Sequence, residues 1–168
     1  IMMAMKKIVF LLILSFLSGH VLQAKPVKKE IKIPEKTLKE NGFNQPDGKF
    51  GYDYMAESEN LVLLWEKSFG KDPAQYADKS KRFYPDEILR EGERFYNYFV
   101  DELKFADRKK SHSSRYKMII WIYNDDETTA YGWGHDGVGM MWFRPCRIQS
   151  YPYCALAHEM GHSFQYMV

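Results

Sequence analysis

The sequence has little cysteine, little net charge and no apolar run long enough to cross a membrane. Only 2 of the 168 residues are cysteines, so the chain is not a small scaffold held together by several disulfides. The longest apolar run, residues 8–17, is about half as long as the roughly 20 residues that a spanning helix needs. Aromatic residues make up 16% of the chain, which argues against intrinsic disorder. The composition therefore indicates a folded domain of modest size.

Residues 1–24 have the layout of a secretory signal peptide. Lys6 and Lys7 precede the apolar run, and small and polar residues follow it up to Ala24, after which we expect cleavage. A retained membrane anchor is the alternative, for which the apolar run is short. The pattern predicts a secreted, periplasmic or extracellular protein with no stable membrane insertion after cleavage of the signal peptide.

The charge of the chain argues against two kinds of partner. The chain carries 24 basic and 22 acidic residues. Residues 1–24 contain two of the basic residues and none of the acidic ones, so their removal leaves equal numbers of each sign. A mature charge near zero gives no support for nucleic acid binding or for a polybasic contact with a membrane.

The apolar pattern predicts an α+β fold, in which a mixed sheet is packed against an amphipathic helix and a second helix ends the chain. Residues 25–57 are polar, and we expect them to be a linker or an N-terminal extension. In the amphipathic helix, all apolar side chains up to Leu103 are expected to face the core. The expected elements are strands at 61–65, 116–123 and 140–143, helices at 85–105 and from 152 to the end, and a glycine-rich loop at 132–139.

Two cysteines, Cys146 and Cys154, flank the segment that leads into the last helix. Export to an oxidising compartment would permit a disulfide between them, which would pin this segment to the first turn of the helix. Eight residues of separation permit a bridge without requiring one. Two buried free thiols are therefore the alternative.

The segment 158–162 is an HExxH motif on the last predicted helix. Residues four apart on a helix differ by about 40° in direction, so the imidazoles of His158 and His162 can bind one Zn²⁺ ion. Glu159 would lie near the ion without being its ligand, which suits a group that transfers protons. We therefore expect zinc as the cofactor, His158 and His162 as its ligands and Glu159 as the general base.

The last predicted helix has two separate faces. One face is apolar and is expected to pack into the core: Leu156, Met160, Phe164 and Met167. The other face is expected to form the floor of a cleft: Ala155, His158, His162 and Gln165. This separation favours a metal site over a chance occurrence of the motif.

A catalytic zinc usually has three protein ligands, and the motif supplies two. In most HExxH enzymes the third lies downstream of the second histidine, but here the chain ends at Val168, and it begins with Ile1 rather than methionine. We therefore expect residues 58–168 to be the N-terminal part of a truncated domain, inactive by itself, with the third ligand after Val168. His135, which lies among glycines, is either a third ligand, an oxyanion donor or a turn residue hydrogen-bonded locally.

The motif helix, the apolar strand before it and the earlier strand-helix-strand unit resemble the N-terminal half of the zincin metallopeptidases. Segments 157–165, 61–65 and 117–120 also resemble a family of secreted bacterial proteins of unknown function. The metzincin pattern HExxHxxGxxH is excluded, because Gln165 and Val168 stand where glycine and histidine are required. The resemblance implies a gluzincin-like site with a downstream glutamate ligand. It also implies that strand 139–143 pairs with extended substrate.

These features together predict an exported zinc metallopeptidase that acts on a peptide or glycoprotein. Zinc would activate a water molecule, and Glu159 would take its proton and later deliver it to the leaving amine. The alternative is a secreted binding module that keeps a zincin-like fold without catalysis.

Overall fold

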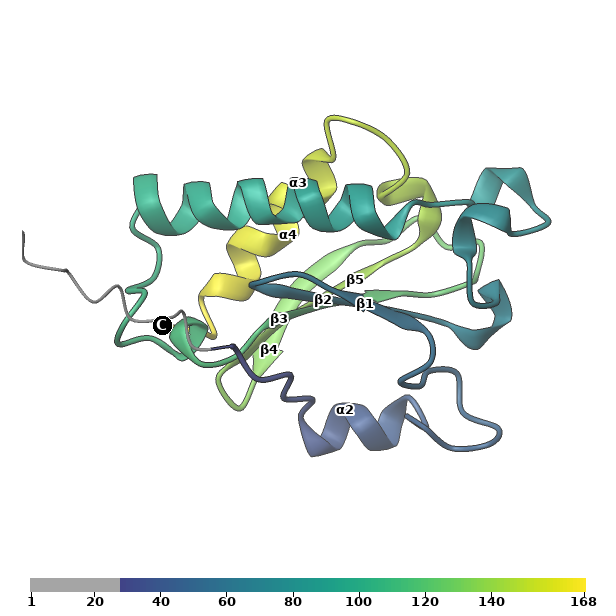
Figure 1. The fold of residues 1–168 in the computed structure, drawn as a ribbon, viewed down its shortest axis with the longest axis horizontal. Coiled ribbons are helices and arrows are strands. Elements are labelled where there is room, and N and C mark those ends of the chain that lie inside the picture. The colour runs from purple at the N-terminus through teal and green to yellow at the C-terminus, as the bar shows by residue number, and fades with distance from the viewer. Residues whose placement is uncertain (1–27) are drawn as a thin grey trace, which may run out of the picture.

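The computed structural model describes residues 28–168 (Figure 1). The expected signal peptide, residues 1–24, lies outside the described residues. The chain has an α+β fold in which helices lie on both faces of a five-stranded mixed sheet, as the sequence predicted. The main elements, in chain order, are α2 (Glu35–Glu40), β1 (Met55–Glu57), β2 (Leu61–Trp65), α3 (Pro85–Asn97), β3 (Met118–Ile122), β4 (Tyr131–His135), β5 (Val138–Phe143) and α4 (Cys154–Phe164).

The sheet has three parallel strands at its centre and an antiparallel strand at each edge. The strand order is β1-β2-β3-β5-β4. β2, β3 and β5 run parallel, whereas β1 and β4 run antiparallel to their neighbours. Every residue of the three central strands is buried. Continuous apolar runs such as Leu61–Trp65 are typical of parallel strands that are covered on both faces.

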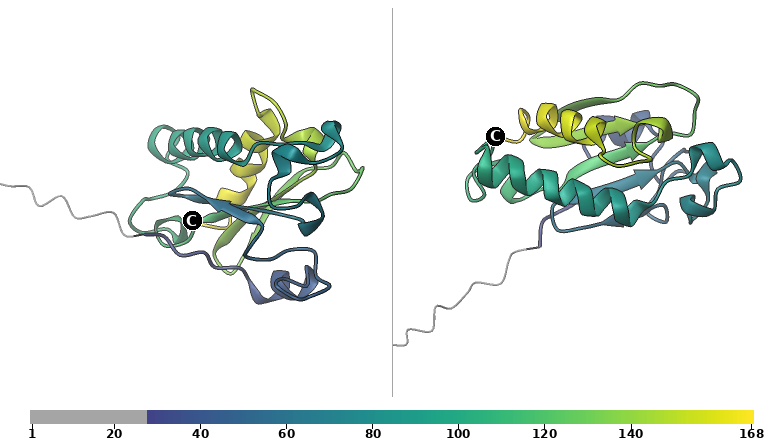
Figure 2. Two further views of the ribbon diagram at one scale, coloured as in Figure 1. Left: turned by 45° about the vertical axis from the view of Figure 1, so that its right-hand side comes forward. Right: turned by 90° about the horizontal axis from the view of Figure 1, so that it is seen from above.

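Helices cover both faces of the sheet. On one face α3 packs against β1 and β2, while α4 packs against β4 and β5 (Figure 2). α2 lies on the opposite face (Figure 1), where the Thr37 hydroxyl contacts the Met140 sulfur at 3.8 Å. The helix that carries the HExxH motif therefore lies over the β4 edge of the sheet.

Residues 28–57 pack against the sheet, although the sequence indicated a linker or an N-terminal extension. Phe50 is fully buried, and its ring makes edge contacts with Trp121 and Tyr123 at centroid distances of 4.9 and 5.1 Å. Residues Met55–Glu57 form the edge strand β1. A few large aromatic side chains hold this segment, and such isolated contacts leave no periodic pattern in the sequence.

The helix predicted at 85–105 is shorter, and its end is exposed. α3 ends at Asn97 and continues as a π-helical turn over Tyr98–Glu102. Tyr96 is buried as predicted, but Leu103 and Phe105 lie beyond the helix and are exposed. The wider π turn changes the angular spacing of side chains, so the 3.6-residue periodicity does not extend to the end of the apolar pattern.

Two local predictions next to the motif are wrong. The predicted glycine-rich loop contains β4, which forms a hairpin with β5 through Asp136 and Gly137, both of which have positive φ. The last helix spans Cys154–Phe164, whereas the sequence predicted it from about residue 152 to the end of the chain. The residue before it, Tyr153, has a left-handed conformation with φ of 56°, so the helix cannot extend further towards the N-terminus.

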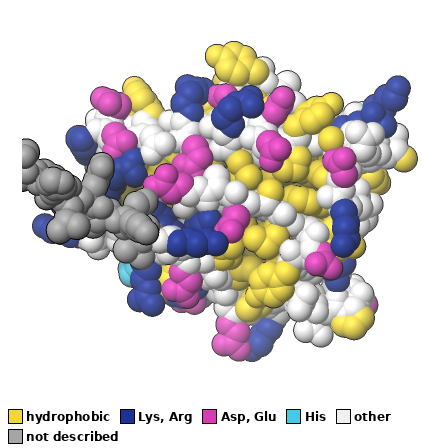
Figure 3. Space-filling view, viewed as in Figure 1, with side chains coloured by type: hydrophobic (Ala, Val, Ile, Leu, Met, Phe, Trp, Pro, Cys, Tyr) yellow, Lys and Arg dark blue, Asp and Glu magenta, His cyan; other side chains and the backbone are white. Residues whose placement is uncertain are grey.

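The surface carries charges of both signs. On the face where β1 forms the edge, basic and acidic side chains are interspersed, and hydrophobic side chains gather between α3 and α2 (Figure 3). Among residues 28–168, no helix has both the length and the hydrophobicity that crossing a membrane requires.

Replacement of Phe50 tests whether the N-terminal segment belongs to the core. Phe50→Ala removes a fully buried ring and should lower the free energy of unfolding by about 3–5 kcal/mol. Asp47→Ala, at an exposed site in the same segment, should change it by no more than about 0.5 kcal/mol. Chemical denaturation followed by circular dichroism measures both. Equal stability of the two variants would mean that the segment is a linker.

Candidate metal centre

Helix α4 is held against the sheet by an apolar face and a polar anchor. Leu156, Met160 and Phe164 are buried, as the sequence predicted for this face. The Ser163 hydroxyl lies 2.8 Å from the carbonyl oxygen of Met140 in β5 and 2.9 Å from that of Glu159. Because Ser163 is one residue after His162, this hydrogen bond fixes the face of the helix that carries the two histidines relative to the sheet.

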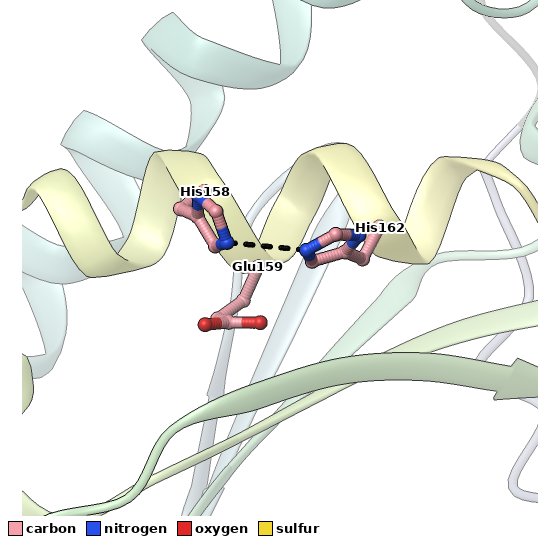
Figure 4. A group of neighbouring side chains, drawn as sticks. All are labelled: His158, Glu159 and His162. Carbon is pink, nitrogen blue, oxygen red and sulfur yellow. Dashed lines mark hydrogen bonds between the residues drawn. The ribbon is translucent and has the colours of Figure 1, made fainter.

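His158 and His162 lie side by side on the outer face of α4 (Figure 4). Both are exposed, and their Nε2 atoms are 3.1 Å apart. The rings are nearly perpendicular, at 80°, with centroids 4.8 Å apart. With one oxygen of the Glu159 carboxylate, the potential ligand atoms all lie within 4.8 Å of one another.

The spacing of the two imidazoles fits a tetrahedral zinc ion. Zinc–nitrogen distances of about 2.0–2.1 Å and tetrahedral angles place two ligating nitrogens about 3.3 Å apart. The observed 3.1 Å between Nε2 atoms is close to this value. Neutral imidazoles could share one hydrogen bond at the same distance, so the distance alone does not identify the occupant. Imidazole nitrogen with a nearby carboxylate is nevertheless a donor set that zinc accepts.

Most of Glu159 is buried, but its carboxylate oxygens reach solvent and have no hydrogen-bond partner in the protein. The residue is 9% exposed and extends from the helix between the two imidazoles (Figure 4). Within residues 28–168 no side chain or backbone group donates a hydrogen bond to its carboxylate oxygens. Among the described residues, Trp121 Nε1 is the one fully buried side-chain polar atom without a partner. The carboxylate oxygens of Glu159 therefore reach solvent and are available to water or a ligand.

Glycines bring the edge strand β4 into contact with α4. A Cβ atom on Gly132 would lie 2.0 Å from the carbonyl oxygen of Glu159, and one on Gly139 would lie 2.8 Å from that of Ser163. A Cβ atom on Gly134 would meet the Tyr166 side chain at 2.4 Å. These contacts leave no room for larger residues. The sequence analysis placed Gly132 in a loop and gave it no role. The alternation Tyr-Gly-Trp-Gly-His at 131–135 could have identified it, because this pattern is typical of a strand with one crowded face.

The other candidate residues lie elsewhere. His135 is at the end of β4, 3.4 Å from the Asp136 carboxylate, and does not belong to the group of His158, Glu159 and His162. Its position therefore does not support the role of third ligand, and it is a strand residue paired with Val138 rather than a turn residue. Within residues 28–168, no fourth His, Cys, Asp or Glu joins the group.

The strand expected to pair with substrate is in the interior of the sheet. β5, which contains residues 139–143, has β3 on one side and β4 on the other, so its backbone groups are already paired. The open edge beside α4 belongs to β4. The sequence analysis chose the wrong strand because it interpreted β4 as a loop.

The two cysteines are free and exposed. Neither expectation, a disulfide or a pair of buried thiols, is met. The Cys146 thiol donates a weak hydrogen bond to the carbonyl oxygen of Glu127 at 3.7 Å, and Cys154 occupies the first position of α4. The start of α4 is therefore held by packing rather than by a covalent bridge.

Exposure of the thiols has a direct test. Maleimide treatment of the native exported protein should add two adducts, one on Cys146 and one on Cys154, because both sulfurs are exposed. Intact-mass spectrometry counts the adducts, and prior reduction should leave the count unchanged. Adducts that appear only after reduction would show that the exported protein contains the disulfide.

The close packing of β4 predicts opposite effects of two glycine substitutions. Gly132→Ala should lower the free energy of unfolding by about 1–3 kcal/mol, because its Cβ atom would overlap a backbone oxygen of α4. Gly161→Ala should be neutral or stabilising by up to about 1 kcal/mol, although it lies within the motif. Its Cβ atom would meet only the Phe99 ring, at 3.5 Å. Urea denaturation compares the two, and a stable Gly132→Ala variant would contradict the strand–helix contact.

Comparison with known proteins identifies the family of this chain. No curated protein and no solved structure matches the chain significantly. The model of one family, described as a family of unknown function (DUF6055), matches residues 23–168. The match includes both the sheet and the HExxH helix. The chain therefore belongs to the DUF6055 family.

Proposed function

We propose that this chain carries the zinc-binding part of an exported zincin-like peptidase. The observation that carries the proposal is a pair of imidazoles 3.1 Å apart beside a carboxylate whose oxygens reach solvent and have no hydrogen-bond partner in the protein. A zinc ion at this site would lower the pKa of a coordinated water molecule towards about 7 and polarise a substrate carbonyl. The chemistry that follows is hydrolysis of an amide bond.

The protein residues have separate tasks in this reaction. His158 and His162 would hold the ion, and their position on a helix anchored through Ser163 keeps the two nitrogens at a ligating distance. Glu159 would accept a proton from the attacking water and return it to the leaving amine. Its carboxylate oxygens reach solvent, so a water molecule can approach them.

The open edge of β4 supports a peptide as the substrate. β4 has a neighbouring strand on only one side, so backbone groups on its other side are available for pairing. An extended peptide added there would run beside α4, because Gly132 touches the backbone of Glu159. Backbone pairing of this kind orients a peptide without selecting for its side chains.

Two substitutions separate metal binding from catalysis. Glu159→Gln in the exported protein should abolish peptide hydrolysis and leave zinc content near that of the wild type, since the imidazoles are untouched. His158→Ala should lose the metal and the activity together. Elemental analysis by plasma mass spectrometry measures zinc, and mass spectrometry of a peptide library measures hydrolysis.

The matched control is Glu102→Gln, an exposed carboxylate in the turn after α3. It should change neither zinc content nor activity. Hydrolysis by Glu159→Gln within about tenfold of wild type would exclude the proton-transfer role. A wild-type protein that binds zinc tightly but cleaves no library peptide would favour the non-catalytic binding module.

A further inference from the structure

The two faces of β4 differ in chemistry. Strand residues alternate between faces. Gly132 and Gly134 face α4, whereas Tyr131, Trp133 and His135 lie on the face that α2 covers in part. The second face lies on the opposite side of the sheet from α4. It carries large side chains that the proposed peptidase reaction does not use.

A groove runs between α2 and this face of β4. It consists of two adjoining cavities of about 260 and 310 Å³. Thr37, Glu40, Trp133 and Trp142 line both cavities. Each cavity is near the lower limit of small-ligand sites, roughly 300 Å³. We call this feature the aromatic groove.

The aromatic groove contains large rings that are not fully buried. Trp133 is 52% exposed and Tyr131 is 45% exposed. The Tyr131 ring stacks on Trp142, with centroids 4.8 Å apart and planes 13° apart, and Trp133 makes an edge contact with Tyr166 at 6.3 Å. These contacts hold the rings in place while parts of them stay open to a ligand. Adjacent exposed rings beside a cavity are typical of a binding surface.

The charges of the groove are already balanced. The Lys36 ammonium group lies 3.8 Å from the Glu40 carboxylate. Lys49 Nζ lies 3.2 Å from Glu66, whose side chain is nearly buried. The lining therefore offers no surplus positive charge for a phosphate or another anion. A neutral ligand fits this balance better.

Fixed polar groups border the rings. The Asn41 amide donates to the carbonyl oxygen of Thr37 at 3.0 Å and accepts from the Tyr123 hydroxyl. Burial raises the pKa of Tyr123 to about 12, so this hydroxyl stays protonated and remains a donor. Glu40 is largely exposed on the rim and can accept further hydrogen bonds. The groove thus combines flat apolar surfaces with acceptors at its side.

We propose that the aromatic groove binds a neutral oligosaccharide. The face of a pyranose ring that carries C–H bonds packs well on the electron-rich face of an indole, here Trp133. Its hydroxyls would donate to the carboxylate oxygens of Glu40, which is largely exposed on the rim. A proline-rich peptide also packs on aromatic grooves, but it offers a carboxylate no hydrogen-bond donor at proline. The carboxylate at the rim therefore favours the sugar.

The two sites would act on the same substrate. Trp133 and Gly132 are neighbours on β4, so a glycan in the aromatic groove would lie next to the strand edge at which we propose that a peptide pairs. This step rests on the proposed peptidase function and implies a glycosylated peptide as its substrate. Sugar binding itself does not depend on the metal.

Calorimetry with cellohexaose and chitohexaose tests the groove, using the exported protein in the presence of EDTA. We expect binding of at least one probe at millimolar concentration. Trp133→Ala should weaken it by about tenfold or more, since it removes the stacking surface, and Trp133→Phe should retain part of it. Tyr84→Ala, which removes an equally exposed ring at the start of α3, should leave binding unchanged.

Each other result would overturn the proposal. Binding that survives in a folded Trp133→Ala variant would place the sugar elsewhere, and the absence of binding by both probes would exclude a glycan. Binding of a proline-rich decapeptide alone would assign the groove to peptides. If Trp133→Ala fails to fold, Glu40→Gln tests the proposal instead, because it leaves the rings intact. This substitution should weaken sugar binding several-fold. Because EDTA removes any metal, none of these outcomes depends on the proposed peptidase activity.

Discussion

The contact between the edge strand β4 and the helix α4 determines where the histidines and the glutamate of the motif lie relative to the open edge of the sheet. Gly132 lets the strand approach the backbone of Glu159, and Ser163 ties the same helix to β5. Together they fix how far the two imidazoles and the carboxylate stand from the open edge of the sheet. A site that hydrolyses an extended peptide needs this distance to be constant, because the scissile bond must reach the metal while its backbone pairs with the strand.

The same strand couples two surfaces with different chemistry. Its glycine face touches α4, the helix that carries the HExxH motif, and its aromatic face lines the groove under α2. This arrangement depends on residues 28–57, since α2 forms the far wall of the groove and Phe50 holds the segment to the core. A segment that resembles a linker by composition thus shapes one of the two surfaces on which a ligand could bind.

The central strands and the motif helix were predictable because their signals are local. Leu61–Trp65 and Met118–Ile122 are uninterrupted apolar runs, and burial on both faces of a parallel sheet is what such runs require. The two faces of α4 follow from 3.6-residue periodicity alone. Prediction failed where the position of a segment depends on contacts between residues that are far apart in the sequence. Phe50 packs on Trp121, and the pattern of residues 25–57 carries no sign of that partner.

The sequence by itself determined the identity of the proposed chemistry, because two histidines and a glutamate at this spacing on a helix converge whatever the rest of the fold does. Only the tertiary structure decided what surrounds them. It placed β4 rather than β5 at the open edge, kept His135 apart from the candidate metal group and left the carboxylate of Glu159 open to solvent without a partner in the protein. The physical reason is that strand order, burial and close packing arise from contacts between segments far apart in the chain, whereas a helical spacing is a property of a few neighbouring residues.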